Sequence, residues 1–379
     1  MLKDWKTILP VARACHEDGQ RFAIATVVGI QGSAYRGLGS RMLIGPKGET
    51  TGLISGGCLE ADVAQHALEV MESGNAKLVT YDSQSNQDLI WGLGLGCGGV
   101  IRILIEKADS PGHRPWFSGL HAAIEAGKAC VLAGTFDPSN PKSVMDLGTL
   151  LMIEGEIAHQ TIQDGHLAEQ VAAEAARLHR NMNQRFDFPI GRVKSMTTPS
   201  SSCQLLLQPL APPPSLVVCG GGIDAEPIVT LSQFLGWETT LALPRPSPLP
   251  HKRWAGPPKT VVTAPENVLE ALPIHSRSCV LIMSHHYQND RHFLANALQS
   301  PATYIGILGP KRRTLQLLSD LKSEGMAVDT TRLFYPMGLD IGAEAPEEIA
   351  LSILAEIRAF IANRQGGHLK FRKGAIHYR

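Results

Sequence analysis

The sequence of 379 residues lacks the features that would place it in several large classes of protein. It has no run of about 18 uninterrupted apolar residues, which a membrane-spanning helix needs, and its N-terminus lacks the apolar core of a secretion signal. Its 35 basic residues balance 35 acidic ones, so no net charge attracts nucleic acid or anionic lipid. We therefore expect a cytoplasmic protein that binds neither nucleic acid nor a membrane.

Cysteine is scarce and scattered. The seven cysteines form no Cys-x-x-Cys pair and show no Cys/His spacing typical of zinc, so neither a disulfide framework nor a structural zinc site is predicted. A thiol that is neither bridged nor bound to a metal is usually a small buried hydrophobe. We expect this for four of them, Cys15, Cys130, Cys203 and Cys279.

What the sequence does have is a proline-dense segment, PLAPPPS at residues 209–215. Proline continues neither a helix nor a central strand, and 379 residues are too many for one ordinary core. We therefore expect two domains with a boundary at this segment. The predicted parts are a first domain (1–208), the linker (209–215), a second domain (216–365) and a basic tail (366–379).

The first domain is predicted to mix helices and strands. Apolar spacing favours a helix near 4–18, a strand at 22–30, two strands joined by a turn within 41–55, a helix at 59–73 and a strand at 98–106. A fainter echo starts at Cys130, where GTLLMIEGEI stands in the place of SRMLIGPKGET. This echo predicts an internal duplication that builds the same sheet, or it is a chance similarity.

The second domain alternates strands with helices. Strands are expected at SLVVCG, ETTLAL, TVVTA, CVLIMS and YIGIL, and helices near 224–235, near 290–298, from Lys311 and from Pro346. Such alternation indicates a parallel sheet with right-handed crossovers. The expected fold class is α/β, with an α/β first domain followed by a Rossmann-like, doubly wound domain.

A glycine loop, LVVCGGGIDAEPIV, stands between a strand and a helix of the second domain. Gly220 permits a tight turn and Gly222 lets the backbone approach a phosphate, although the charge of Asp224 at that helix start would compete with one. The acid that binds ribose in an NAD site is replaced by Leu243, while Arg245 could meet a 2′-phosphate. The loop therefore predicts an NADP-like or molybdopterin-type ligand, with a tight turn that binds nothing as the alternative.

Two segments of the first domain surround a cysteine with glycines, SGGC at 55–58 and GLGCGG at 94–99. Glycines there expose backbone N–H groups and permit close approach of a bulky anion. A cysteine at a helix N-terminus has a stabilised thiolate, which makes it a better nucleophile or soft-metal ligand. The two loops predict one thiol-bearing cleft, and two packed cysteines in tight turns are the alternative.

At these residues the chain resembles the XdhC/CoxI family, the xanthine dehydrogenase accessory proteins. The resemblance covers nearly the whole length. In the first domain it rests on GSAYRGLGSRM (32–42), GLISGGCLE (52–60) and GLGCGG. In the second it rests on VVCGGGIDA, SHHYQND (284–290), YIGILGPKRR (304–313) and YPMGLDIGAEAPEEIALSILAEI (335–357).

The resemblance implies a chaperone rather than an enzyme, one that binds a molybdopterin-based molybdenum cofactor. Family members are understood to protect this cofactor while a cysteine desulfurase helps to install its sulfido ligand, and to pass it to a xanthine dehydrogenase-type apo-hydroxylase. No catalytic residue is implied. The implied cofactor site of the first domain comprises Gln31, Ser33, Arg36, Arg41, Gly56, Gly57, Cys58, Glu60, Cys97, Gly98 and Gly99.

Cys58 and Cys97 are the candidate molybdenum contacts, because thiolates are soft ligands. Arg36 and Arg41 would suit phosphate. Tyr35 stands where family members usually have proline, which either loosens that loop or adds a stacking face for a pterin.

The implied site residues of the second domain are Gly220, Gly222, Arg245, His285, Asp290, Lys311 and Asp340. His285 and Asp290 are expected to form a polar pair near the glycine loop. For His285 and Lys311 the alternative is a solvated position, and for Asp340 it is the cap of a turn.

Two other functions are weighed against the chaperone. One is an NADP-linked oxidoreductase that uses the Gly220 loop and Arg245, although no convincing proton donor is evident. The other is nucleotidyl transfer, which usually needs an acidic metal pair that the sequence lacks. We also expect a homodimer, because one sheet edge of the first domain is hard to cover.

Overall fold

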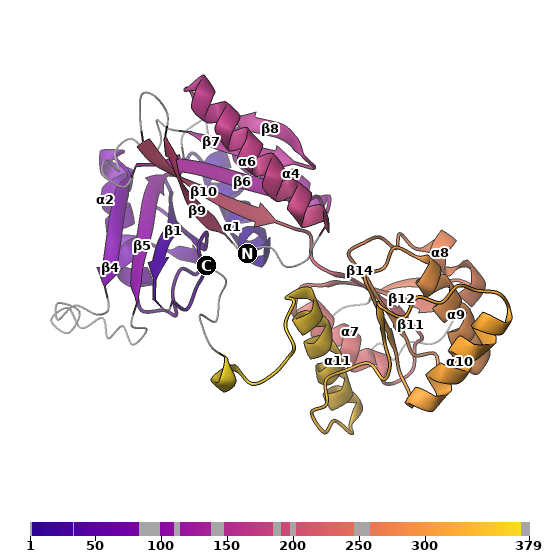
Figure 1. Cartoon of the computed structure of the whole chain (residues 1–379). Helices are drawn as coiled ribbons and strands as arrows, with labels where there is room; N and C mark the ends of the chain where they lie inside the picture. The colour runs from indigo at the N-terminus through magenta and orange to yellow at the C-terminus, as the bar shows by residue number, and fades with distance from the viewer. Residues whose placement is uncertain are drawn as a thin grey trace. The chain divides into compact units, whose positions relative to one another are not determined.

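The computed structural model describes residues 2–32, 34–82, 99–109, 114–137, 148–184, 191–197, 202–245 and 258–372. The chain forms two compact units, one of residues 1–212 with 369–379 and one of residues 213–368 (Figure 1). The proline-dense segment separates β10 (Ser202–Leu210) from β11 (Ser215–Cys219). Within the described residues, no helix is long and apolar enough to cross a membrane.

The described part of the first unit holds two five-stranded sheets, each built by one copy of the same series of elements. The first copy runs α1 (Leu2–Glu17), β1 (Ala23–Gln31), β2 (Arg41–Ile44), β3 (Thr50–Gly52), α2 (Glu60–Ser73), β4 (Lys77–Asp82) and β5 (Val100–Lys107). The second runs α4 (Arg114–Glu125), β6 (Cys130–Phe136), β7 (Thr149–Ile153), β8 (Glu156–Gln160), α6 (Gly165–Gln184), β9 (Arg192–Thr197) and β10.

The two copies also share one topology. Their strand orders are β3-β2-β1-β5-β4 and β8-β7-β6-β10-β9, which are the same order when the copies are aligned. The internal duplication suggested by the sequence is therefore present in the fold. The expectation was wrong in one respect, because the second copy forms a sheet of its own instead of joining the first.

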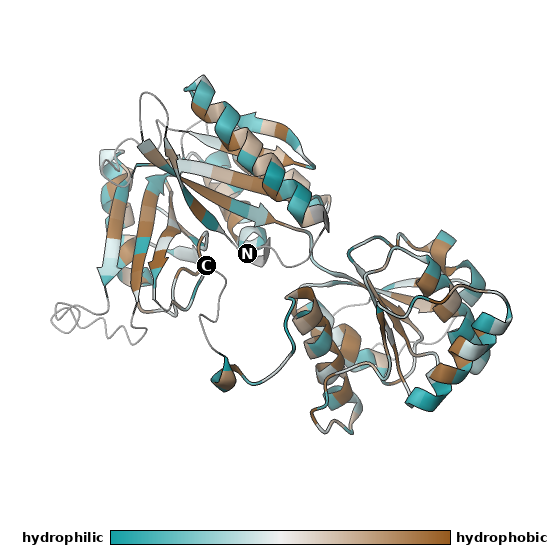
Figure 2. Ribbon diagram, viewed as in Figure 1, coloured by the Kyte–Doolittle hydropathy of each residue, from teal (hydrophilic) through white to brown (hydrophobic). Residues whose placement is uncertain are grey.

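Each sheet carries one helix on its outer face. The inner faces of the two sheets meet around Val28 and Leu206, and α1 and α4 pack between them around Ile24 and Leu132. α2 packs on β1 and β5, and α6 packs on β6 and β10 (Figure 1). Because side chains alternate along a strand, Ala25 and Val27 pack with α2, whereas Ile24 and Val28 point to the other sheet. The central strands β1 and β6 are accordingly buried along most of their length, and brown marks their apolar residues in Figure 2.

The second unit is a Rossmann-like domain. Its elements are β11, α7 (Ala225–Phe234), β12 (Glu238–Leu243), β13 (Lys259–Val262), α8 (Val268–Ala271), β14 (Ser278–Ile282), α9 (Tyr287–Gln299), β15 (Tyr304–Ile307), α10 (Lys311–Ser323), β16 (Leu333–Phe334) and α11 (Pro346–Ile361). All paired strands are parallel, in the order β13-β12-β11-β14-β15-β16. This confirms the expected fold class. The chain adds β12 and β13 on one side of β11 and β14 to β16 on the other, and folds of this kind bind ligands at that change of direction, between β11 and β14.

Candidate functional site

The SGGC turn and Gly99, the last residue of GLGCGG, belong to one end of the first sheet. β3 runs into the SGGC turn, and β5 begins directly after GLGCGG. β1 is antiparallel to β2 and to β5, and β3 is antiparallel to β2. The last residues of β1 and β3 and the first residues of β5 therefore point to the same end of the sheet. Gln31 pairs there with Val100, the neighbour of Gly99. Ser33, Cys97 and Gly98 lie outside the described residues.

The SGGC turn is held by two side chains, that of Ser55 within the turn and that of Glu60 at the start of α2. Ser55 Oγ accepts the N–H groups of Gly57 and Leu59, each at 3.2 Å. The Glu60 carboxylate accepts the N–H groups of Ile54 at 3.2 Å and Ser55 at 2.8 Å, and also the Ser55 hydroxyl. Burial opposes ionisation of Glu60, but these hydrogen bonds outweigh it and lower its pKa. Glu60 therefore fixes the turn and has little capacity left to bind a ligand directly.

Cys58 is the exposed thiol of this turn, and the other five cysteines in the described residues are buried. Its Sγ lies 3.6 Å from Ser55 Oγ. Gly57 has φ +104°, and nothing lies within 4 Å of the place where its Cβ would be. The Tyr35 ring comes within 3.6 Å of the Cβ position of Gly56, and Tyr35 is 64% exposed. The turn thus presents a thiol, an open glycine and an aromatic face.

The two arginines expected to face the thiols have different surroundings. Arg36 Nε donates to the carbonyl of Leu53 at 3.2 Å, and its Nη2 is paired with Asp4. Arg36 therefore braces the approach to the turn against α1. Arg41, at the start of β2, contacts Gln208 of β10 and so points between the two sheets.

The glycine loop of the second unit is tightly packed. A Cβ on Gly220, which has φ +132°, would lie 2.5 Å from the carbonyl oxygen of Met283 beyond β14. Leu243, at the place of the ribose-binding acid, is buried, and its Cδ2 lies 2.6 Å from the Cβ position of Gly221. An apolar side chain therefore packs where a dinucleotide site needs a carboxylate.

A carboxylate instead lies at the start of α7, where a phosphate would bind. Asp224 makes no side-chain capping hydrogen bond, and its Oδ2 lies 2.6 Å from His285 Nε2. Its Oδ1 is buried without a hydrogen bond to any described residue and would meet a Cβ on Gly222 at 2.5 Å. His285 adopts φ +56°, an uncommon conformation for a residue other than glycine.

The expected pairing of His285 with Asp290 is wrong. Asp290 is fully buried and accepts from Ser284 twice, from its N–H at 3.0 Å and from its hydroxyl at 2.6 Å. It also forms an ion pair at 2.7 Å with Arg313 of α10. A buried carboxylate needs such partners, so Asp290 ties the β14–α9 loop to α10 while His285 turns to Asp224.

The remaining candidates of the second unit are exposed. Arg245, Lys311 and Asp340 follow β12, β15 and β16 and so belong to the carboxyl end of the sheet, where ligands of such folds bind. No group of three or more His, Cys, Asp or Glu side chains that could hold a metal ion occurs among the described residues. The ion pair of Arg313 with Asp290 cannot be predicted from the sequence, because no local pattern indicates a contact between separate helices.

Comparison with known proteins agrees with this arrangement. The family model described as the XdhC and CoxI family matches residues 15–82, and the model described as the XdhC Rossmann domain matches residues 216–357. The chain belongs to the XdhC and CoxI family. The first match includes the SGGC turn and the second includes the glycine loop.

Curated relatives and a solved structure extend the similarity over most of the chain. A protein of Bacillus subtilis (strain 168) named as a probable xanthine dehydrogenase subunit is 28% identical over 90% of this chain and 93% of its own length. The molybdenum cofactor insertion chaperone PaoD of Escherichia coli (strain K12) is 25% identical over 93% of this chain and 88% of its own. The crystal structure of a xanthine dehydrogenase from Bacillus halodurans superposes with a TM-score of 0.75, at 28% identity, over 96% of this chain and 98% of that one.

Proposed function

We propose that this protein binds a molybdopterin-based molybdenum cofactor at the SGGC turn and serves as an accessory protein to a molybdenum hydroxylase of the xanthine dehydrogenase type. The observation that carries this proposal is the exposure of Cys58 on a turn that Ser55 and Glu60 hold in place. The names of two relatives, one a molybdenum cofactor insertion chaperone and the other a probable xanthine dehydrogenase subunit, support the same role.

The residues of the turn suit such a cargo. The Cys58 thiolate is a soft ligand of the kind that a molybdenum centre accepts. The open space beside Gly57 admits a bulky group, and the exposed ring of Tyr35 offers a face to a planar heterocycle. Arg36 is already paired with Asp4, so its part in the proposed site is to hold the turn rather than to bind phosphate. Cys97 remains a predicted second contact.

The finer steps of the proposal concern partners. The protein would shield the bound cofactor while a cysteine desulfurase supplies sulfur, and would then deliver it to the apo-hydroxylase. A homodimer remains part of the proposal. Its suggested contact is β8, an edge strand of the second sheet that leaves Ile157 48% exposed.

Cofactor content tests the binding step. The protein would be purified anaerobically from cells that make the cofactor, and its molybdenum and pterin would be measured beside Cys58→Ala, Cys58→Ser and the matched control Glu169→Gln, an exposed position on α6. We expect near-stoichiometric cofactor in the wild type and the control, and loss in both Cys58 variants. Serine keeps size and polarity but is not a soft ligand, so full retention by Cys58→Ser would contradict the thiolate contact.

The rival function, an NADP-linked oxidoreductase, has less support in the geometry. The Asp224 carboxylate at the start of α7 would repel a dinucleotide phosphate, and Leu243 offers the ribose no hydrogen bond. Arg245 is exposed near the same end of the sheet and would favour a 2′-phosphate. We therefore prefer the accessory role.

A further inference from the structure

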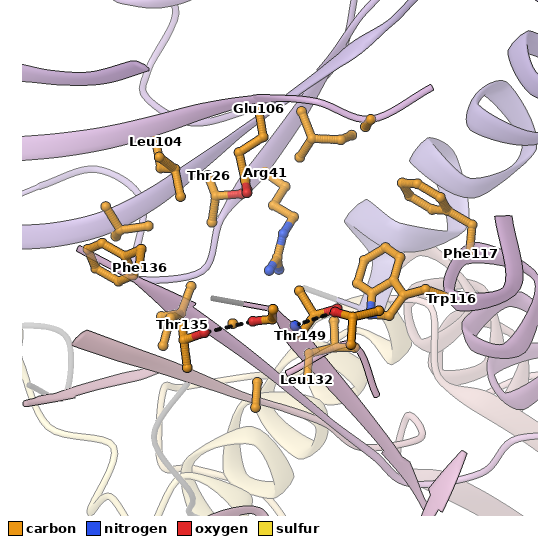
Figure 3. Close-up of a pocket in the computed structure, with 18 residues that line it drawn as sticks. Thr26, Arg41, Leu104, Glu106, Trp116, Phe117, Leu132, Thr135, Phe136 and Thr149 are labelled. Atoms are coloured by element: carbon orange, nitrogen blue, oxygen red, sulfur yellow. Dashed lines mark hydrogen bonds between the residues drawn. The ribbon is translucent and has the colours of Figure 1, made fainter. Parts of the chain in front are cut away.

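A pocket of about 270 Å³ lies between the two sheets of the first unit (Figure 3). It separates two apolar clusters of the inter-sheet core, one around Ile24 and Leu132 and the other around Val28 and Leu206. Its walls come from both copies of the duplicated fold, including β1 and β5 from the first and β6 from the second. Cys58 is not among the lining residues, so this pocket is separate from the SGGC turn.

A missing side chain helps to keep the pocket open. Along β6, Leu132, Gly134 and Phe136 occupy alternate positions and so face the same side, toward the other sheet. Nothing lies within 4 Å of the place where a Cβ on Gly134 would be. Glycine inside a strand weakens it and often marks the close approach of a ligand. Interiors are otherwise packed nearly as densely as crystals, so this space needs an explanation.

The polar groups of the pocket include a donor that is only partly satisfied. Arg41 extends into the space (Figure 3), held by Gln208, by the Gly39 carbonyl at 3.3 Å, and by the Trp5 ring, whose centroid is 4.9 Å from its Cζ. A guanidinium has five N–H donors and no acceptor. These contacts leave donors available toward the pocket, while their protein partners fix the direction of the group.

The acceptor is Glu106, which lies beside Arg41 and Thr26 in Figure 3. Its carboxylate makes neither a hydrogen bond nor an ion pair with any other described residue. Burial raises its pKa to about 7, although Arg41 opposes this change. Near neutral pH the group can therefore either accept hydrogen bonds or donate one. An acid and a cation that face one pocket without pairing leave both available to a third partner.

Aromatic and hydroxyl side chains complete the walls. Trp116 and Phe117 lie on one flank and Leu104 and Phe136 on the other (Figure 3). The Thr149 and Thr161 hydroxyls, 3.4 Å apart, form a polar rim. A suitable ligand therefore has apolar faces and a polar edge.

The charges narrow the choice of ligand. A simple anion would satisfy Arg41 but repel ionised Glu106, and a simple cation would do the reverse. A neutral flat ring with N–H donors on one edge and a carbonyl on another satisfies both. We propose that this pocket binds a fused pyrimidine heterocycle, the ring system shared by pterins and oxopurines, with its N–H edge on Glu106 and its carbonyl on Arg41.

This proposal goes beyond the proposed function, because it concerns a second site and needs no molybdenum. Calorimetric titration of the full chain with pterin and with hypoxanthine tests it and distinguishes the two sources of the ring. Benzoate and indole serve as an anionic and an apolar probe of similar size. We expect one-to-one binding of pterin, of hypoxanthine or of both, with at least tenfold weaker binding of benzoate and indole.

Two variants assign the binding to this pocket. Glu106→Gln should weaken it at least tenfold and Gly134→Val, which fills open space, should abolish it, whereas Glu169→Gln should leave it unchanged. A melting curve shows whether Gly134→Val is folded. If it is not, the titration of Glu106→Gln alone shows whether the heterocycle binds in this pocket. The absence of binding to both heterocycles at millimolar concentration, or equal binding by wild type and Glu106→Gln, would overturn the proposal. Either result would leave the Cys58 dependence of cofactor content untouched, so the two claims fail separately.

Discussion

Glu106 offers a direct test of the inter-sheet pocket through the pH dependence of stability. Its carboxyl has a pKa of about 7 in the folded protein, against an ordinary value of 4.5. Between these values the folded state binds more protons than the unfolded state, so stability falls as pH rises from 4.5 to 7. The full difference corresponds to about 3 kcal/mol, and water in the pocket would reduce it, so we expect a loss of about 1–3 kcal/mol.

The assay is urea unfolding at pH 5 and pH 8, followed by the fluorescence of tryptophans that include Trp5 and Trp116, whose rings pack 5.4 Å apart in the first unit. Wild type should lose about 1–3 kcal/mol between the two pH values relative to Glu106→Gln, because glutamine cannot ionise. Glu169→Gln, at an exposed position of α6, should follow wild type. If wild type and Glu106→Gln change equally with pH, the carboxylate is not held in a desolvated site and the reasoning is refuted.

Three further outcomes are expected. Glu60→Ala should lower stability by about 1–3 kcal/mol and reduce cofactor content as strongly as Cys58→Ala, because the N–H groups of the turn lose their acceptor. Unchanged cofactor content in Glu60→Ala would show that Glu60 does not hold the turn. Asp290→Asn should destabilise the second unit by about 3 kcal/mol in thermal unfolding, because Arg313 loses its buried partner, and a change below 1 kcal/mol would show that the pair is unimportant. Equilibrium dialysis should detect no saturable NADPH binding up to millimolar concentration, and tight binding would revive the oxidoreductase.

The sequence predicted the elements well, because their apolar periodicity is strong. The expected strand at 22–30 and helix at 59–73 correspond to β1 (Ala23–Gln31) and α2 (Glu60–Ser73), and the parallel order of the second unit followed from simple alternation. The echo near Cys130 pointed to a repeat, but periodicity says which face of a strand is apolar and not which sheet it joins. Two stacked sheets could therefore not be distinguished from one extended sheet.

The candidate site was predicted less completely, because its details depend on contacts across the fold. Cys58 at the mouth of α2 could be recognised from neighbouring glycines, and it is exposed. The contact of Arg41 with Gln208 could not be recognised, because the two residues lie far apart in the chain and only the packing of the two sheets brings them together. The same holds for Asp290 of α9 and Arg313 of α10, which lie on separate helices and are connected by no spacing rule.

The central claim is that the cofactor lies against Cys58, and alkylation of that thiol tests it most directly. Iodoacetamide would be added anaerobically to cofactor-loaded and to cofactor-free protein, and the labelling rate of Cys58 would be followed by mass spectrometry. The exposed thiol should be alkylated readily in the cofactor-free protein and be protected in the loaded protein. Equal labelling rates in a loaded sample of known molybdenum content would place the cofactor elsewhere and contradict the account.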